Sequence, residues 1–355
     1  MDLSIGDLAL AIGARLTDEA YAERRIEGLR SLDAAEPRHV TFYRGDPRYL
    51  PNLRATRAAA IIADTDPGGA PCPLLLVEDA GVTVSFLLAA VRDIQNPPPP
   101  PGIHAAATVD PAATLGPDVT VGAGAVIEAG VQLGARSRVL ANAFVGRGSV
   151  FGEDCVLHPG AQVMHNCRLG ARVVLWPYAV VGRDGFGFLQ RDGRHLRIPQ
   201  VGGVSIGDDV EIGAFSSVDR GALDPTVVEA GVKIDSHCHV AHNCRIGENA
   251  MLIGYARMGG SVTIGRGAIL AQDAAVGERR TVGDGAICAT AATVMYSDVA
   301  AGEAVLGHPA RPFQRQKRID VAMDRLPELL GELRELRKRV AQLETADETA
   351  ANRSA

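Results

Sequence analysis

Apolar residues recur at every sixth position through most of the chain. The first run of this spacing extends from Ile103 to Val181, and two further runs cover residues 206–218 and 228–294. None of these positions carries a charged side chain. A period of six matches neither the 3.6-residue repeat of a helix nor the two-residue alternation of a single strand. It predicts a solenoid of short parallel strands joined by tight turns, in which each repeat directs one apolar side chain into a shared core.

The composition agrees with such a solenoid. Aromatic residues make up only 4% of the chain, whereas 40 residues are glycine. A core filled by aliphatic side chains, with a backbone that turns tightly at many points, has this composition. With three strands per coil, the repeats would form roughly ten coils.

The repeat divides the chain into segments. Residues 1–95 lack it and predict a small α/β domain, and "NPPPPPG" at 96–102 predicts a stiff polyproline linker. The solenoid is expected over 103–306, interrupted by an insertion at about 183–203 and by a shorter one at "DRGALDPT". Insertions in a solenoid leave from turns and often border binding sites. Residues 307–355 predict a helix followed by a disordered tail, "ETADETAANRSA".

Local patterns predict several elements outside the solenoid. "SIGDLALAIGA" and residues 81–94 predict helices, and "AAAIIAD" and "PLLLVED" predict buried strands. A heptad seam is formed by Leu329, Leu333, Leu336, Val340 and Leu343. Such a seam packs against copies of itself in an oligomer or against its own solenoid.

The net charge, the first residues and the cysteines limit which partners and which cellular compartment are expected. The net charge of -6 argues against nucleic acid as the main partner, because a phosphate-binding surface is normally basic. The first residues, "MDLSIGDLAL", lack the basic region of a secretory signal, and no apolar run approaches the length of a membrane span. The six cysteines form no CxxC motif, which favours reduced thiols in a cytoplasmic protein.

The segment "DSHCHVAHNCRIG" brings three histidines close together in the sequence, His237, His239 and His242. One interpretation is a metal site, because the spacing is similar to the HxxxxHxC segment of gamma-class carbonic anhydrases and catalytic zinc commonly has three protein ligands. The nearest histidine upstream is His195, and the position expected for a third ligand of that family holds none. A second interpretation is that His237 and His239 only decorate a turn or a subunit face, and a third is that His242 is a catalytic base.

Five segments point to one family: "GRDGFGF" at 182–188, "IPQVGGVSIGDDVEIGA" at 198–214, "DRGALDPTVV" at 219–228, the AHN segment around His242, and "GHPARP" at 307–312. Together with the three-part layout, they resemble the UDP-3-O-acylglucosamine N-acyltransferases of lipid A synthesis, which are hexapeptide-repeat acyltransferases. The resemblance implies a mainly β chain with a left-handed parallel β-helix.

The resemblance also implies site residues. His242 would be the general base, Asn243 its partner, and Asp235 a residue that binds substrate or orients the site. Gly260 follows His242 by 18 residues, one full coil, so the period by itself predicts that the two stack. The role of the Gly260 N–H as a donor to the reaction's oxyanion is implied by the family.

Four further residues are implied to bind substrate. "HVTFYRGDPRYL" is similar to the family's uridine-binding TFxxNPKY segment, so Phe42 would stack on uracil and Tyr49 would hydrogen-bond the nucleotide. This chain has one extra residue between these aromatics. Phe186 and Phe188 would line the acyl or pantetheine path, unless "DGFGF" is only a surface loop. Arg279 occupies the position of the family's second histidine and would hold a phosphate.

The expected function is transfer of a 3-hydroxyacyl chain from acyl carrier protein to the 2-amine of UDP-3-O-acylglucosamine, in a cytoplasmic homotrimer without metal or diffusible cofactor. The basic run Arg311, Arg315, Lys317 and Arg318 would dock an acidic carrier or form a solvated helix face. The alternatives are a sugar-nucleotide acetyltransferase that uses acetyl-CoA, a zinc enzyme similar to carbonic anhydrase, and a non-catalytic scaffold.

Overall fold

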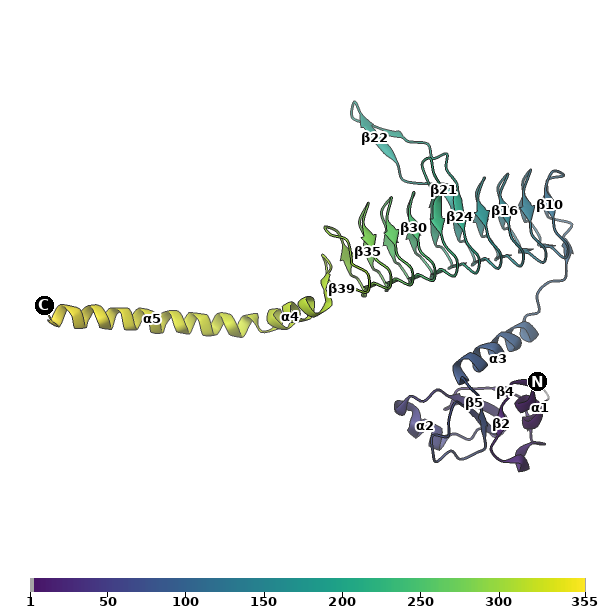
Figure 1. Cartoon of the computed structure of the whole chain (residues 1–355), viewed down its shortest axis with the longest axis horizontal. Helices are drawn as coiled ribbons and strands as arrows, with labels where there is room; N and C mark the ends of the chain where they lie inside the picture. Colours follow the sequence, from purple (N-terminus) through teal and green to yellow (C-terminus); the bar gives the residue numbers. More distant parts are fainter. Residues whose placement is uncertain (1–2, 355) are drawn as a thin grey trace. The chain divides into compact units, whose positions relative to one another are not determined.

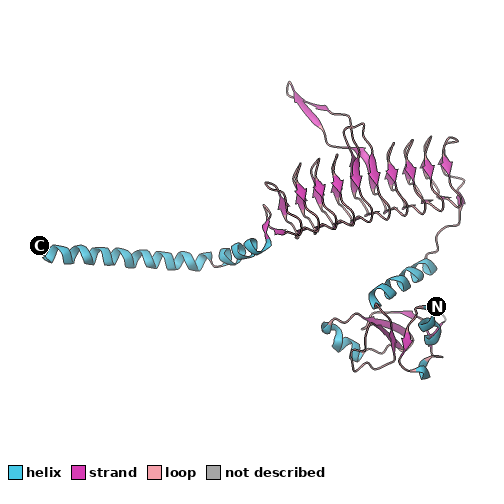
Figure 2. Cartoon of the chain, in the orientation of Figure 1, coloured by secondary structure: helices cyan, strands magenta, loops and turns pink. Residues whose placement is uncertain are grey.

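The computed structural model describes the backbone of residues 3–354 and the side chains of residues 3–343. The chain forms two compact units, Met1–Pro99 and Pro100–Ala355. Figure 1 labels their main elements, and Figure 2 separates helices from strands.

The amino-terminal unit is a five-stranded sheet with helices packed on it. The order in this sheet is β2-β7-β6-β5-β4, and β1 pairs separately with β3. The elements are β1 (Leu3–Ser4), α1 (Ile5–Ala11), β2 (Arg15–Leu16), η1 (Glu19–Tyr21), β3 (Arg25–Ile26), β4 (Gly28–Leu29), β5 (His39–Tyr43), η2 (Pro47–Tyr49), α2 (Leu50–Ala55), β6 (Ala60–Ala63), β7 (Leu74–Leu76) and α3 (Ala80–Gln95). The two helices and two buried strands predicted from the sequence are confirmed as α1, α3, β6 and β7.

The second unit is a parallel β-solenoid with three faces, each a long sheet of two- to five-residue strands. The 12-stranded face contains β8 (Gly102–Ile103), β11 (Thr120–Val121), β14 (Arg138–Val139), β17 (Val156–Leu157), β20 (Val174–Leu175), β25 (Glu211–Ile212), β28 (Lys233–Ile234), β31 (Met251–Leu252), β34 (Ile269–Leu270), β37 (Ile287–Cys288), β39 (Ala304–Leu306) and β40 (Arg311–Pro312). All pairs in it are parallel except β39 with β40.

The other two faces follow the same plan. The 10-stranded face contains β9 (Thr108–Val109), β12 (Val126–Ile127), β15 (Phe144–Val145), β18 (Gln162–Val163), β21 (Val180–Asp184), β26 (Ser217–Arg220), β29 (His239–Val240), β32 (Arg257–Met258), β35 (Ala275–Val276) and β38 (Thr293–Val294). The 9-stranded face contains β10 (Thr114–Leu115), β13 (Gln132–Leu133), β16 (Val150–Phe151), β19 (Arg168–Leu169), β24 (Val204–Ile206), β27 (Thr226–Val228), β30 (Arg245–Ile246), β33 (Thr263–Ile264) and β36 (Thr281–Val282).

The six-residue period has a simple structural cause. The second residue of nearly every strand points inward, so Val121, Ile127 and Leu133 on three successive faces are all buried. Each buried aliphatic side chain contributes about 1.5–3 kcal/mol of transfer free energy. Turn residues such as Asn142 and Asp154 adopt left-handed backbone with positive φ, which lets the chain change direction within two residues. The predicted parallel β-solenoid is confirmed.

Both insertions leave the solenoid from the same corner. The first departs after β21 and contains a hairpin, β22 (Phe188–Arg191) and β23 (Arg194–Arg197), that projects from the coils (Figure 1). The "DGFGF" segment runs from the end of β21 to the start of β22. An Asp192-Gly193 turn closes the hairpin, and Asp-Gly is a two-residue sequence that favours such turns. The second insertion separates β26 from β27.

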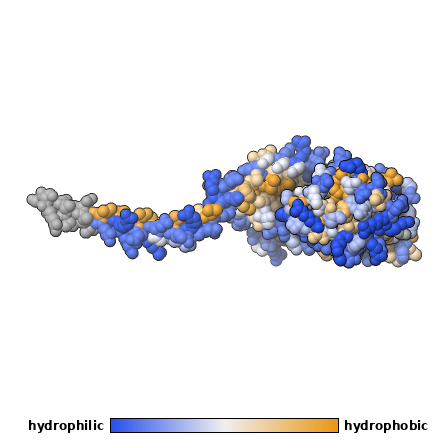
Figure 3. Space-filling view, turned by 90° about the horizontal axis from the view of Figure 1, so that it is seen from below, coloured by the Kyte–Doolittle hydropathy of each residue, from blue (hydrophilic) through white to orange (hydrophobic). Residues whose placement is uncertain are grey.

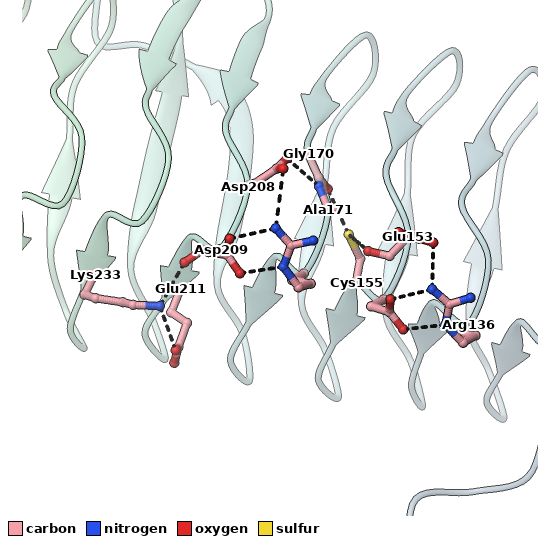
Figure 4. Close-up of polar contacts among 11 residues, drawn as sticks. Arg136, Glu153, Cys155, Gly170, Ala171, Asp208, Asp209, Glu211 and Lys233 are labelled. Carbon is pink, nitrogen blue, oxygen red and sulfur yellow. Dashed lines mark hydrogen bonds and ion pairs between the residues drawn. The ribbon is translucent and has the colours of Figure 1, made fainter. Parts of the chain in front are cut away.

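Arginine and acidic residues alternate along another corner, between the 9-stranded and 12-stranded faces (Figure 4). Each arginine pairs with an acidic residue on the next coil: Arg136 with Asp154, and Arg172 with Asp209. These groups are solvent-exposed, so each pair contributes little to stability. They give this corner a structural role.

Two helices follow the last coil, α4 (Phe313–Asp324) and α5 (Leu326–Ser354). The helix α5 continues through the segment for which the sequence predicted disorder, and that segment contains no glycine or proline to end a helix. The heptad residues from Leu329 to Leu343 are exposed and form an apolar band along one side of α5 (Figure 3). Within the described residues, no helix is long and apolar enough to cross a membrane.

Candidate active site

One corner of the solenoid, between the 10-stranded and 9-stranded faces, gathers most of the predicted site. Five neighbouring strands of the 10-stranded face, β21, β26, β29, β32 and β35, end at this corner. Both insertions leave from the first two of these strands. His242 follows β29, Gly260 follows β32 and Arg279 follows β35. The first insertion therefore borders the corner that holds His242 and Gly260.

Asn243 holds the imidazole of His242. Its Oδ1 lies 3.0 Å from the His242 Nδ1 and also accepts a hydrogen bond from the Ala222 N–H at 3.1 Å, while its Nδ2 donates to the Asp224 carbonyl. These two backbone partners fix which end of the amide is oxygen. Nδ1 of His242 must therefore donate, which leaves the lone pair on Nε2. Asn243 also has left-handed backbone, with φ of 60°. The structure thus makes Asn243 a partner of the histidine and a turn residue together.

Gly260 stacks on His242, as the repeat period predicts. The Ser261 N–H donates to the His242 carbonyl at 2.9 Å. A Cβ placed on Gly260 would lie only 2.6 Å from Cε1 and 2.8 Å from Nε2 of His242, so no larger residue fits beside this ring. Among the residues that the structure describes, the Gly260 N–H has no backbone acceptor, so it is free to bind a ligand.

Gly185, from the "DGFGF" insertion, is a second glycine in contact with His242. A Cβ on Gly185 would lie 2.7 Å from Cβ and 2.8 Å from Cδ2 of His242. The two glycines come from strands on opposite sides of β29 in the sheet. The sequence analysis did not select Gly185, although two glycines beside phenylalanines in an insertion indicate a close backbone approach.

Asp219 is a buried acid beside this corner that the sequence analysis also missed. Its side chain is fully buried and pairs with Arg183, Nε to Oδ1 at 2.8 Å. Its Oδ2 lies 3.7 Å from Nε2 of His239, whose Nδ1 is 2.9 Å from the Ser217 hydroxyl. Burial raises the pKa of Asp219 to about 6, while the positive charge of Arg183 opposes this change. For His239, burial and the nearby Arg183 lower the pKa. The sequence signal that could have indicated Asp219 is its position at the start of the "DRGA" segment.

The three histidines do not converge on one point. His237 lies at the corner between the 12-stranded and 10-stranded faces, stacked between Phe215 and Tyr255 with ring centroids 5.2 and 5.0 Å away. His239 lies on β29, and His242 lies at the next corner. Within the described part of the chain, no group of three or more histidine, cysteine or acidic side chains is placed to hold a metal ion. His237 thus lies at a turn, with φ of 60°.

Asp235 is not brought beside His242 within one chain. It follows β28, so it lies at the corner that holds His237. Its carboxylate accepts hydrogen bonds from the N–H groups of Ser236 and Gly254, at 2.7 and 2.9 Å. It also lines a groove of about 610 Å³ together with Trp176 and other residues of the 12-stranded face. Asp235 and His242, seven residues apart, therefore lie at different corners of one coil, and the substrate-binding or orienting role of Asp235 stays a prediction.

The remaining predicted residues of this corner are the exposed Phe186 and Arg279 and the half-buried Phe188. Phe186 has 80% of its surface exposed and packs edge-on against Phe188, with ring centroids 4.9 Å apart. The guanidinium of Arg197 lies over the Phe188 ring. Arg279 donates its backbone N–H to the Gly260 carbonyl, and among the described residues its exposed side chain pairs with Glu278 alone, 3.5 Å away. Arg279 is therefore available to a ligand one coil beyond Gly260.

Phe42 and Tyr49 line one cleft of about 520 Å³ in the amino-terminal unit. Asp46 also lines it, but Arg48 binds both oxygens of that carboxylate at 2.6–3.1 Å and neutralises its charge. Arg44, another lining residue, has no ion pair among the described residues. The two predicted aromatic residues therefore line the same cleft, and Arg44 adds a positive charge to it.

Known proteins resemble this chain in repeat, sequence and fold. Residues 148–183 match the bacterial transferase hexapeptide model (six repeats), and residues 113–147 match the hexapeptide repeat of succinyl-transferase. The UDP-3-O-acylglucosamine N-acyltransferase of Herminiimonas arsenicoxydans is 39% identical over 266 residues, covering 74% of this chain and 75% of that protein. The enzyme of the same name from Coxiella burnetii is 34% identical over 261 residues, covering 73% and 75%.

A solved structure supports the fold. The Arabidopsis UDP-N-acetylglucosamine acyltransferase is 26% identical with a TM-score of 0.54, covering 59% of this chain and 73% of that protein. The resemblance expected from the "DGFGF", "DRGA" and "AHN" segments is thus confirmed by relatives that match almost three quarters of the chain. The chain belongs to the family of UDP-3-O-acylglucosamine N-acyltransferases.

Proposed function

We propose that this chain transfers a 3-hydroxyacyl group from acyl carrier protein to the 2-amine of UDP-3-O-acylglucosamine, with His242 as the general base. The observation that carries the proposal is the held imidazole, which keeps Nδ1 bonded to Asn243 and leaves Nε2 free on a ring that packs against Gly260. A base and an oxyanion donor side by side are what acyl transfer from a thioester to an amine needs.

The reaction follows from this geometry. Nε2 of His242 accepts a proton as the amine nitrogen attacks the thioester carbon, which forms the C–N bond and places negative charge on the carbonyl oxygen. The Gly260 N–H donates to that oxygen. The C–S bond then breaks, and the imidazolium returns its proton to the leaving thiolate. Proton transfer of this kind contributes about 10²–10⁴-fold to the rate.

We assign binding roles to other predicted residues from the chemistry of the surfaces on which they lie. The cleft with Phe42 and Tyr49 would hold the uridine, because an aromatic face stacks on a base and a phenol hydrogen-bonds it. Phe186 and Phe188 would contact the acyl or pantetheine chain, and Arg279 a phosphate. The basic residues of α4, including Arg315 and Arg318, would contact the acidic carrier.

The active assembly would be a homotrimer in the cytoplasm. The corner with Asp235 and the groove beside Trp176 would face the His242 corner of a neighbouring copy, which gives Asp235 its substrate-binding role. The exposed heptad band of α5 supplies an apolar surface for such association. The six cysteines are free thiols, as in a reducing compartment.

A donor panel tests the proposal. Full-length protein and UDP-3-O-acylglucosamine would be mixed with 3-hydroxyacyl carrier proteins of several chain lengths or with acetyl-CoA, and the products weighed by mass spectrometry. We expect an amide product from the carrier proteins and a loss of about 10²–10⁴-fold in His242→Ala. His104→Ala is the control, because this imidazole caps only its own turn at Ala106 in the first coil. Transfer from acetyl-CoA alone, or a normal rate in His242→Ala, would contradict the proposal.

A further inference from the structure

Both insertions begin on a two-stranded extension of the solenoid. β21 and β26 pair in register through Val181 and Val218 and, after a bulge at Gly182, continue to the pairs Arg183–Asp219 and Asp184–Arg220. The neighbouring strands β18 and β29 end before this level. The extension therefore determines where the "DGFGF" segment starts.

Arg220 is buried in this extension, with 1% of its surface exposed. Its Nε donates to the carbonyl of the bulge residue Gly182 at 2.7 Å, and one terminal nitrogen donates to the His165 carbonyl at 2.8 Å. The other terminal nitrogen lies 2.6 Å from Nε2 of His165. A guanidinium can only donate, so this Nε2 accepts. Asp184 is 3.8 Å from the Arg220 Nε.

Asp219 fixes the other side of the bulge. Its carboxylate binds Arg183 through Nε at 2.8 Å and a terminal nitrogen at 3.2 Å. The consecutive residues Asp219 and Arg220 thus hold Arg183 and Gly182, which are also consecutive. Three residues beyond Gly182 lies Gly185, whose α-carbon faces His242.

We propose that Arg220 is a positioning residue for His242: by fixing the bulge at Gly182, it holds Gly185 against the imidazole. This inference rests on the proposed role of His242 as the base. Burying a guanidinium is costly unless every donor is paired, and here the donors reach acceptors on two coils. Lysine has one nitrogen and cannot reproduce this fork, so the requirement is for arginine.

The experiment compares substitutions at both ends of the contact in the full-length enzyme. Arg220→Met and Arg220→Lys remove the fork. His165→Phe removes the acceptor, whereas His165→Gln places an amide oxygen near the former Nε2. The readouts are kcat and KM in the donor assay, and hydrogen exchange of peptides covering residues 182–188 and 244–252.

We expect Arg220→Met to lower kcat by about 10–100-fold, because a displacement near 1 Å in a catalytic site costs about this much. The KM for the UDP-sugar should change by less than about threefold, because the nucleotide cleft is elsewhere. Exchange should accelerate in 182–188 and stay unchanged in 244–252. His165→Gln should behave as wild type, and His165→Phe should resemble Arg220→Met. Arg220→Lys should recover only part of kcat.

Each other outcome has a definite meaning. Normal kcat in Arg220→Met, with or without faster exchange, would overturn the positioning role. Equal kcat in His165→Gln and His165→Phe would also overturn the positioning role. If the Arg220 variants do not fold, the comparison of these two His165 variants is the test of the proposal. An inactive wild type, or an active His242→Ala, would contradict the proposed function instead, and the exchange data would still report whether Arg220 holds the segment.

Discussion

Gly260 lies so close to His242 that a Cβ on the glycine would overlap the imidazole, at 2.6 Å from Cε1. One coil of the solenoid separates these residues in sequence, and the Ser261 N–H bonds directly to the His242 carbonyl. The absence of a side chain at position 260 thus gives the imidazole its space, and the Gly260 N–H has no backbone acceptor among the described residues.

The contact predicts the effect of adding one methyl group. Gly260→Ala should displace the imidazole and lower kcat by about 10²-fold or more, since both the base and the oxyanion donor move. Gly185→Ala should also lower kcat, because its Cβ would meet Cβ and Cδ2 of His242. Steady-state kinetics would measure both. Gly331→Ala is the control, because a Cβ at this exposed helical position meets nothing within 4 Å. Equal activity in all three variants would contradict the packing argument.

Asn243 should matter through its amide more than through its backbone. Asn243→Gly keeps the left-handed conformation but removes the Oδ1 that holds Nδ1 of His242. We expect kcat to fall by about 10-fold or more, because the imidazole loses both its orientation and its fixed tautomer. Asn249→Gly is the matched control, since Asn249 has φ of 56° at a different corner. A similar loss in both variants would show that the turn, and not the hydrogen bond, is what matters.

Asp219 should make stability depend on pH. Its pKa in the folded chain, about 6, lies above the ordinary 3.8, so between these values the folded state binds this proton more tightly. The stability that Asp219 contributes therefore falls as pH rises through about 4 to 6. Asparagine does not ionise, so Asp219→Asn should gain stability relative to wild type over this window, by up to about 3 kcal/mol. Thermal unfolding at a series of pH values would measure the difference.

Asp284 provides a control of opposite sign. The backbone and side chain of Arg266 lower the pKa of Asp284, so its contribution is present above about pH 4 and is lost only as pH falls further. The difference between Asp284→Asn and wild type should then be flat from about pH 4 to 7. A flat difference for Asp219→Asn as well would be inconsistent with a buried, proton-retaining carboxyl.

The two arginines at the nucleotide cleft, Arg44 and Arg48, should contribute differently to UDP binding. Arg44 lines the cleft without an ion pair among the described residues, whereas Arg48 is bound by Asp46. Arg44→Met should weaken UDP binding by about 10-fold, because a diphosphate loses its free cation, and Arg48→Met should weaken it less. Titration calorimetry with UDP would measure both, with Phe42→Ala as a variant that loses base stacking. Stronger weakening by Arg48→Met would assign the diphosphate to the other side of the cleft.

The six-residue period determined the solenoid and even the stacking of Gly260 on His242, because neighbours in a solenoid are separated by a fixed number of residues. The family segments likewise selected His242 and Asn243. The same period separates Asp235 from His242, which lie at different corners of the coil, since each six-residue step turns the chain by one face.

Only the tertiary structure decided what the insertions contribute. Gly185 reaches His242 because the bulge at Gly182 and the buried Arg220 redirect the chain, and no period encodes a contact between residues 57 positions apart. The contacts of the buried Asp219 with Arg183 and His239 likewise form only in the folded chain, because those residues lie on two other strands. Repeats specify their neighbours by spacing, whereas segments that leave the repeat are placed by long-range side-chain contacts that appear only when the chain is folded.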